Sequence, residues 1–197
     1  PETLLDLGCG DGSFMKFISK GKNCKIVGID IFKDVVIKAK NSGAYDLVIQ
    51  GDVIKESRKL IKQKKRFDTV FSCQLIEHMN QKNGELLLSL IDHLAINRAV
   101  VATPRGFVEA EDLSGHNPYR HHISGWSIDT FAKRGYTVHG LGFKYGLPKL
   151  GISKMNNKLI ASIYMIRTFM MSPFVYLFPT LGAGILAIKK MKENNEY

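Results

Sequence analysis

Glycines and carboxylates follow the first apolar run of the chain in a pattern that could hold a ligand. Residues 6–12 read D-L-G-C-G-D-G, and glycines in such a turn let backbone amides approach a bound molecule closely. A dinucleotide-binding turn has the spacing G-x-G-x-x-G, whereas Ser13 stands where its last glycine would be. Asp6 beside the turn would repel a pyrophosphate but suits an ammonium group. The motif therefore points away from a dinucleotide.

Two further carboxylates follow the next two apolar runs. Asp30, in G-I-D-I at 28–31, lies roughly 20 residues beyond the glycine turn, where a carboxylate can accept hydrogen bonds from both hydroxyls of a ribose. Asp52, in G-D-V at 51–53, is placed to bind the exocyclic amine of an adenine. Each aspartate alone is equally typical of a helix cap. Because both follow strands at one edge of a sheet, they predict, with the glycine turn, a site for an adenosine-containing ligand.

Alternating apolar and amphipathic segments would position these residues. Short apolar runs predict strands at Thr3–Leu7, Lys25–Ile29, Leu47–Gln50, Thr69–Ser72 and Ala99–Thr103. Helical patterns lie between them, at Ser13–Ser19, Asp34–Lys40, Lys55–Ile61 and Gly84–Ala95. This alternation indicates a parallel sheet with helices on both faces. After a loop-like stretch at 104–125, we predict a helix at Trp126–Arg134, a strand at Tyr136–Leu141, a helix at Met155–Met171 and a strand at Gly182–Lys189.

The chain resembles the class I S-adenosylmethionine-dependent methyltransferases. The matching stretches are residues 6–12, 28–31, 51–53 and F-D-T-V-F-S-C-Q-L-I-E-H at 67–78, and the resemblance continues more loosely through 121–126 and 135–136. It implies a Rossmann-like α/β fold, with a seven-stranded, mostly parallel sheet, helices on both faces and a C-terminal antiparallel hairpin. We expect a single domain over 1–197, in which 3–103 bind the cofactor and 104–197 form the acceptor side, the lid loop and the final strands.

By this resemblance the cofactor is S-adenosyl-L-methionine and the product S-adenosyl-L-homocysteine. The glycine turn would contact the methionine part, Asp30 the ribose, and Ile31 and Asp52 the adenine, with Cys73 and Gln74 beside the sulfonium. The predicted cofactor-binding residues are Asp6, Gly8, Cys9, Gly10, Asp30, Ile31, Asp52, Val53, Cys73 and Gln74. The helix that family members usually carry before the first strand is missing from this sequence, so we expect part of the cofactor lid to be absent.

Methyl transfer requires donor and acceptor in line, water excluded, and a base only where the acceptor must lose a proton. Histidine suits the role of base. Among His78, His116, His121 and His122 we predict His78 and His121 as catalytic residues. A packing or capping role for His78 and simple solvation of the others are the alternatives. Neither Cys73, which lacks a preceding proline, nor N-P-Y at 117–119, which follows the fifth strand, is predicted to be catalytic.

The net charge is +10, from 28 basic and 18 acidic residues, which favours anionic partners. Seven basic residues fall within 55–66. No aromatic residues interleave them, so we interpret them as the solvated face of a helix rather than a nucleic-acid site. Three widely spaced cysteines indicate a reducing, cytoplasmic compartment. No zinc-type or EF-hand spacing is present, and we predict no metal ligands.

Residues 159–188 contain a single charge, Arg167. The stretch is long enough to span a bilayer, but Pro173, Pro179 and glycines would split it into a helix, a turn and a strand. Its apolar side chains over 159–181 could line an acceptor pocket, form a homodimer interface, or rest on a membrane as a peripheral contact. We favour a surface that is buried or covered by a partner.

These features predict a methyltransferase that moves a methyl group from S-adenosylmethionine to a small-molecule acceptor, by O-methylation. The acceptor pocket is expected from Thr103–Trp126 and from the helix after Met155. Two alternatives stay open. The net charge alone suggests a tRNA or rRNA methyltransferase, and the apolar segment suggests a non-catalytic cofactor-binding subunit of a membrane-associated partner.

Overall fold

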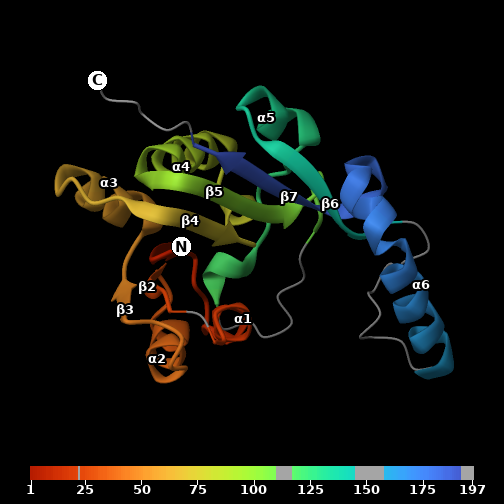
Figure 1. The fold of residues 1–197 in the computed structure, drawn as a ribbon, viewed down its shortest axis with the longest axis horizontal. Helices are drawn as coiled ribbons and strands as arrows, with labels where there is room; N and C mark the ends of the chain where they lie inside the picture. Colours follow the sequence, from red (N-terminus) through yellow and green to blue (C-terminus); the bar gives the residue numbers. More distant parts are fainter. Residues whose placement is uncertain (22, 110–116, 145–157, 192–197) are drawn as a thin grey trace.

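One sheet of seven strands forms the centre of the molecule (Figure 1). The structure is a computed structural model, and it describes residues 1–21, 23–109, 117–144 and 158–191. The strands are β1 (Thr3–Leu7), β2 (Lys25–Asp30), β3 (Leu47–Gln50), β4 (Phe67–Cys73), β5 (Ala95–Pro104), β6 (Thr137–Phe143) and β7 (Gly182–Lys190). Their order is β3-β2-β1-β4-β5-β7-β6. β1 to β5 pair in parallel, and β7 lies antiparallel between β5 and β6, which confirms the predicted sheet and its C-terminal hairpin.

Helices cover both faces of this sheet. They are α1 (Ser13–Ile18), α2 (Lys33–Asn41), α3 (Val53–Lys62), α4 (Gln81–Leu94), α5 (Ile128–Lys133) and α6 (Lys158–Leu177). A large core cluster joins the sheet to α3, α4 and α5, and a smaller cluster joins it to α2. Val48 and Ile49 of β3 pack in different clusters. Because successive side chains of a strand point to opposite faces, the two clusters lie on opposite sides of the sheet.

Side-chain caps explain why two helices begin where they do. Asn80 Oδ1 accepts a hydrogen bond from the amide of Asn83 at 2.9 Å, so α4 begins before the predicted Gly84. Ser127 Oγ accepts from the amide of Thr130 at 3.2 Å, so α5 begins after the predicted Trp126. Caps of this kind satisfy amides that have no partner inside the helix.

The basic run at 55–66 lies largely on α3 and faces the solvent. The helix buries Val53, Ser57 and Leu60. The side chains of Lys55, Arg58, Lys59 and Lys62 are exposed on its other side.

The longest helix, α6, departs from its prediction. We expected it to end at Met171, because a proline has no amide to donate within a helix. In the structure Ser172 Oγ donates to the carbonyl oxygen of Phe169 at 2.7 Å, which is the acceptor that an amide at Pro173 would have used. The helix therefore continues to Leu177. The predicted start at Met155 lies outside the described residues.

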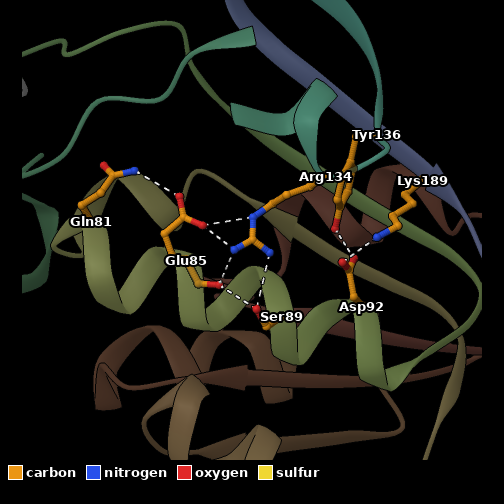
Figure 2. Close-up of polar contacts among 7 residues, drawn as sticks. All are labelled: Gln81, Glu85, Ser89, Asp92, Arg134, Tyr136 and Lys189. Carbon is orange, nitrogen blue, oxygen red and sulfur yellow. Dashed lines mark hydrogen bonds and ion pairs between the residues drawn. The ribbon is translucent and has the colours of Figure 1, made fainter. Parts of the chain in front are cut away.

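A polar network ties the C-terminal half of the chain to α4 (Figure 2). Arg134, which follows α5, donates to the Glu85 carboxylate through both Nε and Nη2, and to the Glu85 carbonyl oxygen at 3.2 Å. Further along α4, Asp92 accepts from Tyr136 Oη at 2.6 Å and from Lys189 Nζ of β7 at 2.7 Å. These charge-assisted contacts hold α5, β6 and β7 in place against α4.

Close packing between α4 and Trp126 makes Gly84→Ala destabilising. A Cβ atom at Gly84 would lie 2.2 Å from Trp126 Cζ2, and Trp126 is 1% exposed. Overpacking a core costs about 1–3 kcal/mol, against roughly 1 kcal/mol that alanine gains over glycine in a helix. We expect a lower free energy of unfolding in urea. Lys82→Ala, exposed on the same helix, is the control and should change stability by less than about 0.5 kcal/mol. Equal stability of Gly84→Ala and the wild type would contradict this account of the packing.

Candidate active site

A cavity of about 790 Å³ opens where the carboxyl ends of four parallel strands meet. Its walls include Gly8 after β1, Ile31 after β2, Asp52 after β3 and Gln74 after β4. β1 has β2 on one side and β4 on the other, so the order of the strands reverses at β1. Open α/β sheets bind ligands at such a reversal, outside the carboxyl ends of the strands.

The glycine turn after β1 forms one wall of the cavity and requires its glycines. Gly8, Gly10 and Gly12 all have positive φ, at 76°, 55° and 80°. A Cβ atom at Gly8 would lie 2.9 Å from Leu75 Cδ1, and one at Gly12 would lie 2.8 Å from Ser42 Oγ. At Gly10, apart from its own chain neighbours, no atom of the described residues lies within 4 Å of that position. The turn therefore brings bare backbone to the cavity at Gly8 and Gly10, both of which line it.

Asp30 joins this turn to the end of β2. Its Oδ2 accepts from the amide of Gly10 and its Oδ1 from the amide of Phe32, each at 2.9 Å. Asp30 also lines the cavity. Because a carboxylate offers about four acceptor positions, both oxygens can still accept from ligand hydroxyl groups.

The two residues predicted to bind the adenine, Ile31 and Asp52, follow β2 and β3, and Val53 is next to Asp52. Ile31, Asp52 and Val53 all line the cavity. Asp52 Oδ1 accepts from the amide of Lys55 at 2.9 Å and so caps α3. The capping interpretation is therefore correct for one of its oxygens, and the binding role stays a prediction.

Asp6 and Cys9 lie behind the turn and are not among the residues that line the cavity. Asp6 is 4% exposed, and its Oδ2 accepts from Tyr45 Oη at 2.7 Å. Burial raises the pKa of Asp6 to about 7, and the nearby charge of Asp30 adds to this rise, while the Tyr45 hydrogen bond opposes it. Burial likewise raises the pKa of the Cys9 thiol. These two residues support the turn from below.

The end of β4 brings Cys73 and Gln74 to the same site. Gln74 lines the cavity in a left-handed conformation, with φ 52°, held by its amide, which donates to the Ala102 carbonyl oxygen at 2.8 Å. Such backbone strain in a residue other than glycine is concentrated at functional sites. Burial and the charges of Asp6 and Glu77 raise the pKa of Cys73 to about 11. Cys73 is therefore a thiol at neutral pH, as expected for a residue that is not a nucleophile.

A buried carboxylate, that of Glu77, comes shortly after Gln74 in the chain. Glu77 is 2% exposed, and its Oε2 accepts from Thr103 Oγ1 at 2.9 Å. Its Oε1 is buried and has no hydrogen-bond partner within the described structure. Burial raises the pKa of Glu77, while the Thr103 hydrogen bond and the charges of His78 and His122 oppose the rise.

Two histidine rings meet this carboxylate. His78 and His122 lie edge to face, with ring centroids 4.8 Å apart. His78 Nδ1 lies 3.1 Å from the carbonyl oxygen of His121, and His122 Nδ1 lies 2.7 Å from that of Val108. A carbonyl oxygen can only accept, so Nδ1 carries the hydrogen in both rings. When such a ring is neutral, its Nε2 is left to accept a proton or bind a metal.

Glu77, His78 and His122 together could hold a metal ion. One potential ligand atom from each lies within 4.8 Å of the others. No metal ligands were predicted, because the sequence has no zinc-type or EF-hand spacing. His122 lies far along the chain from Glu77, so no spacing rule joins them. Carboxylate and imidazole ligands suit several divalent cations.

The two predicted catalytic histidines have different surroundings. His78 lines the cavity. The His121 side chain is exposed and is not among the lining residues, and this residue contacts the site through its carbonyl oxygen on His78. His116 lies outside the described residues.

The acceptor side is formed differently from the prediction. Asn117, Tyr119 and Ile123 line the cavity, as expected for part of Thr103–Trp126. None of the described residues of α6 does, so the prediction for the helix after Met155 was wrong there. The reason is topological, since α6 packs on β6, and β5 and β7 separate β6 from the strands at the cavity.

Sequence reasoning also missed several polar lining residues. Asn80 and Asn83, at the start of α4, face the cavity. The Asn-x-x-Asn spacing of a capped helix could have found them, had the helix start been placed correctly. Asn117 and Tyr119 belong to the N-P-Y stretch that was set aside.

The carboxyl-end cavity and the glycine turn define a Rossmann-like domain that binds an adenosine-type ligand. Residues 5–97 match the family model described as a methyltransferase domain. The mitochondrial ubiquinone biosynthesis O-methyltransferase of Saccharomyces cerevisiae is 29% identical over 105 residues, which cover 46% of this chain and 34% of that protein. The chain thus spans about a third of the length of this relative.

Solved structures share the fold. A SAM-dependent methyltransferase from Archaeoglobus fulgidus matches with a TM-score of 0.59 and 18% identity, over 96% of this chain and 86% of that one. The magnesium protoporphyrin IX methyltransferase of Synechocystis PCC 6803, with bound SAM, matches with a TM-score of 0.53 and 13% identity, over 96% and 69% of the chains. Together, the family match over residues 5–97 and the shared fold support a class I S-adenosylmethionine-dependent methyltransferase domain.

Asp6→Asn is expected to remove part of the pH dependence of folding. With a pKa of about 7 against 3.8 ordinarily, folded Asp6 keeps a proton that the unfolded chain releases above about pH 4. This contribution to stability is full below pH 4 and is lost as the pH rises to about 7. Urea unfolding of wild type and Asp6→Asn should therefore give a stability difference that changes across this window and is constant above it.

Tyr45→Phe provides the matched control for Asp6. The Tyr45 hydrogen bond lowers the pKa of Asp6, so its removal should extend the loss of stability to higher pH. A stability difference between wild type and Asp6→Asn that does not vary with pH would contradict the assignment.

Proposed function

We propose that this protein transfers the methyl group of S-adenosylmethionine to an oxygen atom of a small-molecule acceptor. The observation that carries the proposal is that Asp30, Asp52 and His78 line the same cavity. The bound SAM of the Synechocystis structure supports the cofactor, and the name of the yeast relative supports oxygen as the acceptor atom.

The cofactor would occupy the side of the cavity formed by β1, β2 and β3. Asp30 would accept from the ribose hydroxyls, and Ile31 and Asp52 would contact the adenine. The methionine part would lie along the backbone of Gly8 and Gly10, with its sulfonium end near Gln74. The cationic sulfonium favours this region, because the Asp30 carboxylate lines it.

The acceptor would enter between His78 and the 117–123 segment. Methyl transfer to a hydroxyl group needs removal of a proton, and Nε2 of His78 can accept one while its Nδ1–H stays on the His121 carbonyl oxygen. Glu77 beneath it would stabilise the imidazolium that forms. Asn117, Tyr119 and Ile123 would hold the acceptor in line with the sulfonium and limit access of water.

A divalent cation on Glu77, His78 and His122 is a second way for the same cluster to act. The buried Oε1 of Glu77, which has no hydrogen-bond partner among the described residues, favours it, since a buried acceptor without a partner is costly. A cation there would polarise an acceptor hydroxyl group and make a free base unnecessary.

The direct test is transfer of labelled methyl groups from S-adenosylmethionine to a panel of phenols, other alcohols, amines and total RNA. Labelled small-molecule ethers are the expected product. Label in RNA only, or tight cofactor binding with no transfer to any acceptor, would contradict the proposal. Magnesium or manganese added after treatment with EDTA decides the role of the cluster, because activity that depends on the cation supports the metal and unaffected activity supports the histidine base.

Asp30→Ala is expected to weaken S-adenosylmethionine binding by about 1–3 kcal/mol, the usual cost of losing hydrogen bonds to a charged group. The loss includes the ribose contacts and the two amide contacts that shape the turn. Calorimetric titration measures it, with the exposed Asp129→Ala, outside this cavity, as the control. An unchanged affinity would contradict the ribose assignment.

His78→Ala is expected to lower kcat by about 100-fold or more, the lower range for loss of a general base. Cofactor affinity should stay within a few-fold of wild type, since the predicted cofactor contacts lie on other walls. His93→Ala, an exposed histidine in the last turn of α4, is the matched control and should keep full activity. Equal kcat values for the two variants would remove His78 from the reaction.

A further inference from the structure

The helix α6 presents an apolar surface on the outside of the protein. Among its described residues Val175 is buried, and large apolar side chains elsewhere on the helix are exposed. We call this surface the α6 patch. It consists of Leu159, Ile160, Ile163, Met165, Ile166, Phe169, Met170, Phe174, Tyr176, Leu177 and Phe178. These residues are therefore not buried within the described chain, which leaves a covering partner as the favoured expectation, since so large an exposed patch marks an interaction site.

The end of α6 is fixed to the body while the rest extends away from the sheet (Figure 1). A Cβ atom at Gly140 of β6 would lie 2.4 Å from the Val175 carbonyl oxygen, so only glycine permits this approach. The rings of His139 and Tyr176 stack at 3.9 Å. The last turns are thus docked on β6, and the helix is apolar on the faces that it presents outward.

The charges around α6 indicate which partner would cover it. Residues 144–167, which run from the end of β6 into α6, contain five lysines and arginines and no aspartate or glutamate. The Arg167 guanidinium lies 5.4 Å from the centre of the Phe143 ring of β6 and 5.2 Å from that of the Tyr164 ring. A second copy of this chain would bring one basic segment against another. An anionic lipid bilayer offers acyl chains to the patch and negative headgroups to the lysines.

The connections of α6 determine how it would meet a bilayer. By length and composition the helix could cross a membrane. Yet the amide of Lys144, just after β6, donates to the carbonyl oxygen of Leu181, just after α6, at 2.9 Å. The chain therefore leaves and re-enters the sheet at one point. A single crossing by α6 would put these two hydrogen-bonded residues on opposite sides of the membrane, so a spanning helix does not fit.

We propose that α6 docks the protein onto an anionic lipid bilayer and lies within its interfacial layer rather than across it. This inference goes beyond the methyl transfer proposed above and does not depend on it, because lipid binding needs neither cofactor nor acceptor.

The test is flotation of the full chain with vesicles of phosphatidylcholine alone or mixed with phosphatidylglycerol. We expect binding to the mixed vesicles that weakens with added salt. Ile166→Ser with Phe169→Ser, at side chains 63% and 77% exposed, should lower the partition coefficient by at least about tenfold, since burial of one such side chain accounts for that much. Ile37→Ser, 49% exposed on α2, is the matched control and should bind like wild type.

Three results would overturn the proposal. The first is no binding to either kind of vesicle. The second is a dimer in sedimentation equilibrium that Ile166→Ser with Phe169→Ser dissociates, which would assign the α6 patch to a second copy. The third is binding that resists an alkaline carbonate wash, which would indicate a spanning helix. Circular dichroism and S-adenosylmethionine titration of the variant show that the rest of the fold is intact.

Discussion

The carboxylate of Asp30 is the contact on which the geometry of the site depends. Its two oxygens accept from the amides of Gly10 and Phe32, so one side chain joins the turn after β1 to the loop after β2. Hydrogen bonds to an ionised acceptor are stronger than neutral ones. The side chain proposed to meet the ribose therefore also shapes the walls around it. The two carboxylate oxygens of Asp30 would thus both hold the turn in place and bind the ribose.

On the acceptor side, Glu77 likewise connects separate segments of the site. The amides of Ile123 and Ser124 donate to its carbonyl oxygen at 2.9 and 3.2 Å, so its backbone fixes the segment that covers the cavity. Its side chain meets Thr103 and lies beside His78 and His122. A buried carboxylate is costly unless it is paired or protonated. Burial accordingly raises the pKa of Glu77, and the charges of the two histidines offset part of this rise.

The cofactor half was predictable because its signals are local. Strand patterns, the glycine turn and Asp30 each depend on a few adjacent residues, and parallel pairing brings them to one edge. The acceptor half depends on contacts between distant segments. Nothing in the local sequence indicates that His122 lies beside Glu77. Helix propensities also do not include the hydrogen bond from Ser172 Oγ to the Phe169 carbonyl oxygen, with which α6 continues beyond Pro173. The position of α6 was missed because β7 inserts between β5 and β6, which moves that helix away from the cavity.

This separation also relates the two proposals to each other. α6 packs on β6, at one edge of the sheet, whereas the cavity opens over β1 to β4. A protein held on a bilayer by α6 would keep the glycine turn and Asp30 away from that contact. A charged, water-soluble cofactor could then exchange with its product while the protein stays bound. The sheet order thus allows membrane docking and cofactor turnover to proceed without competing for one surface.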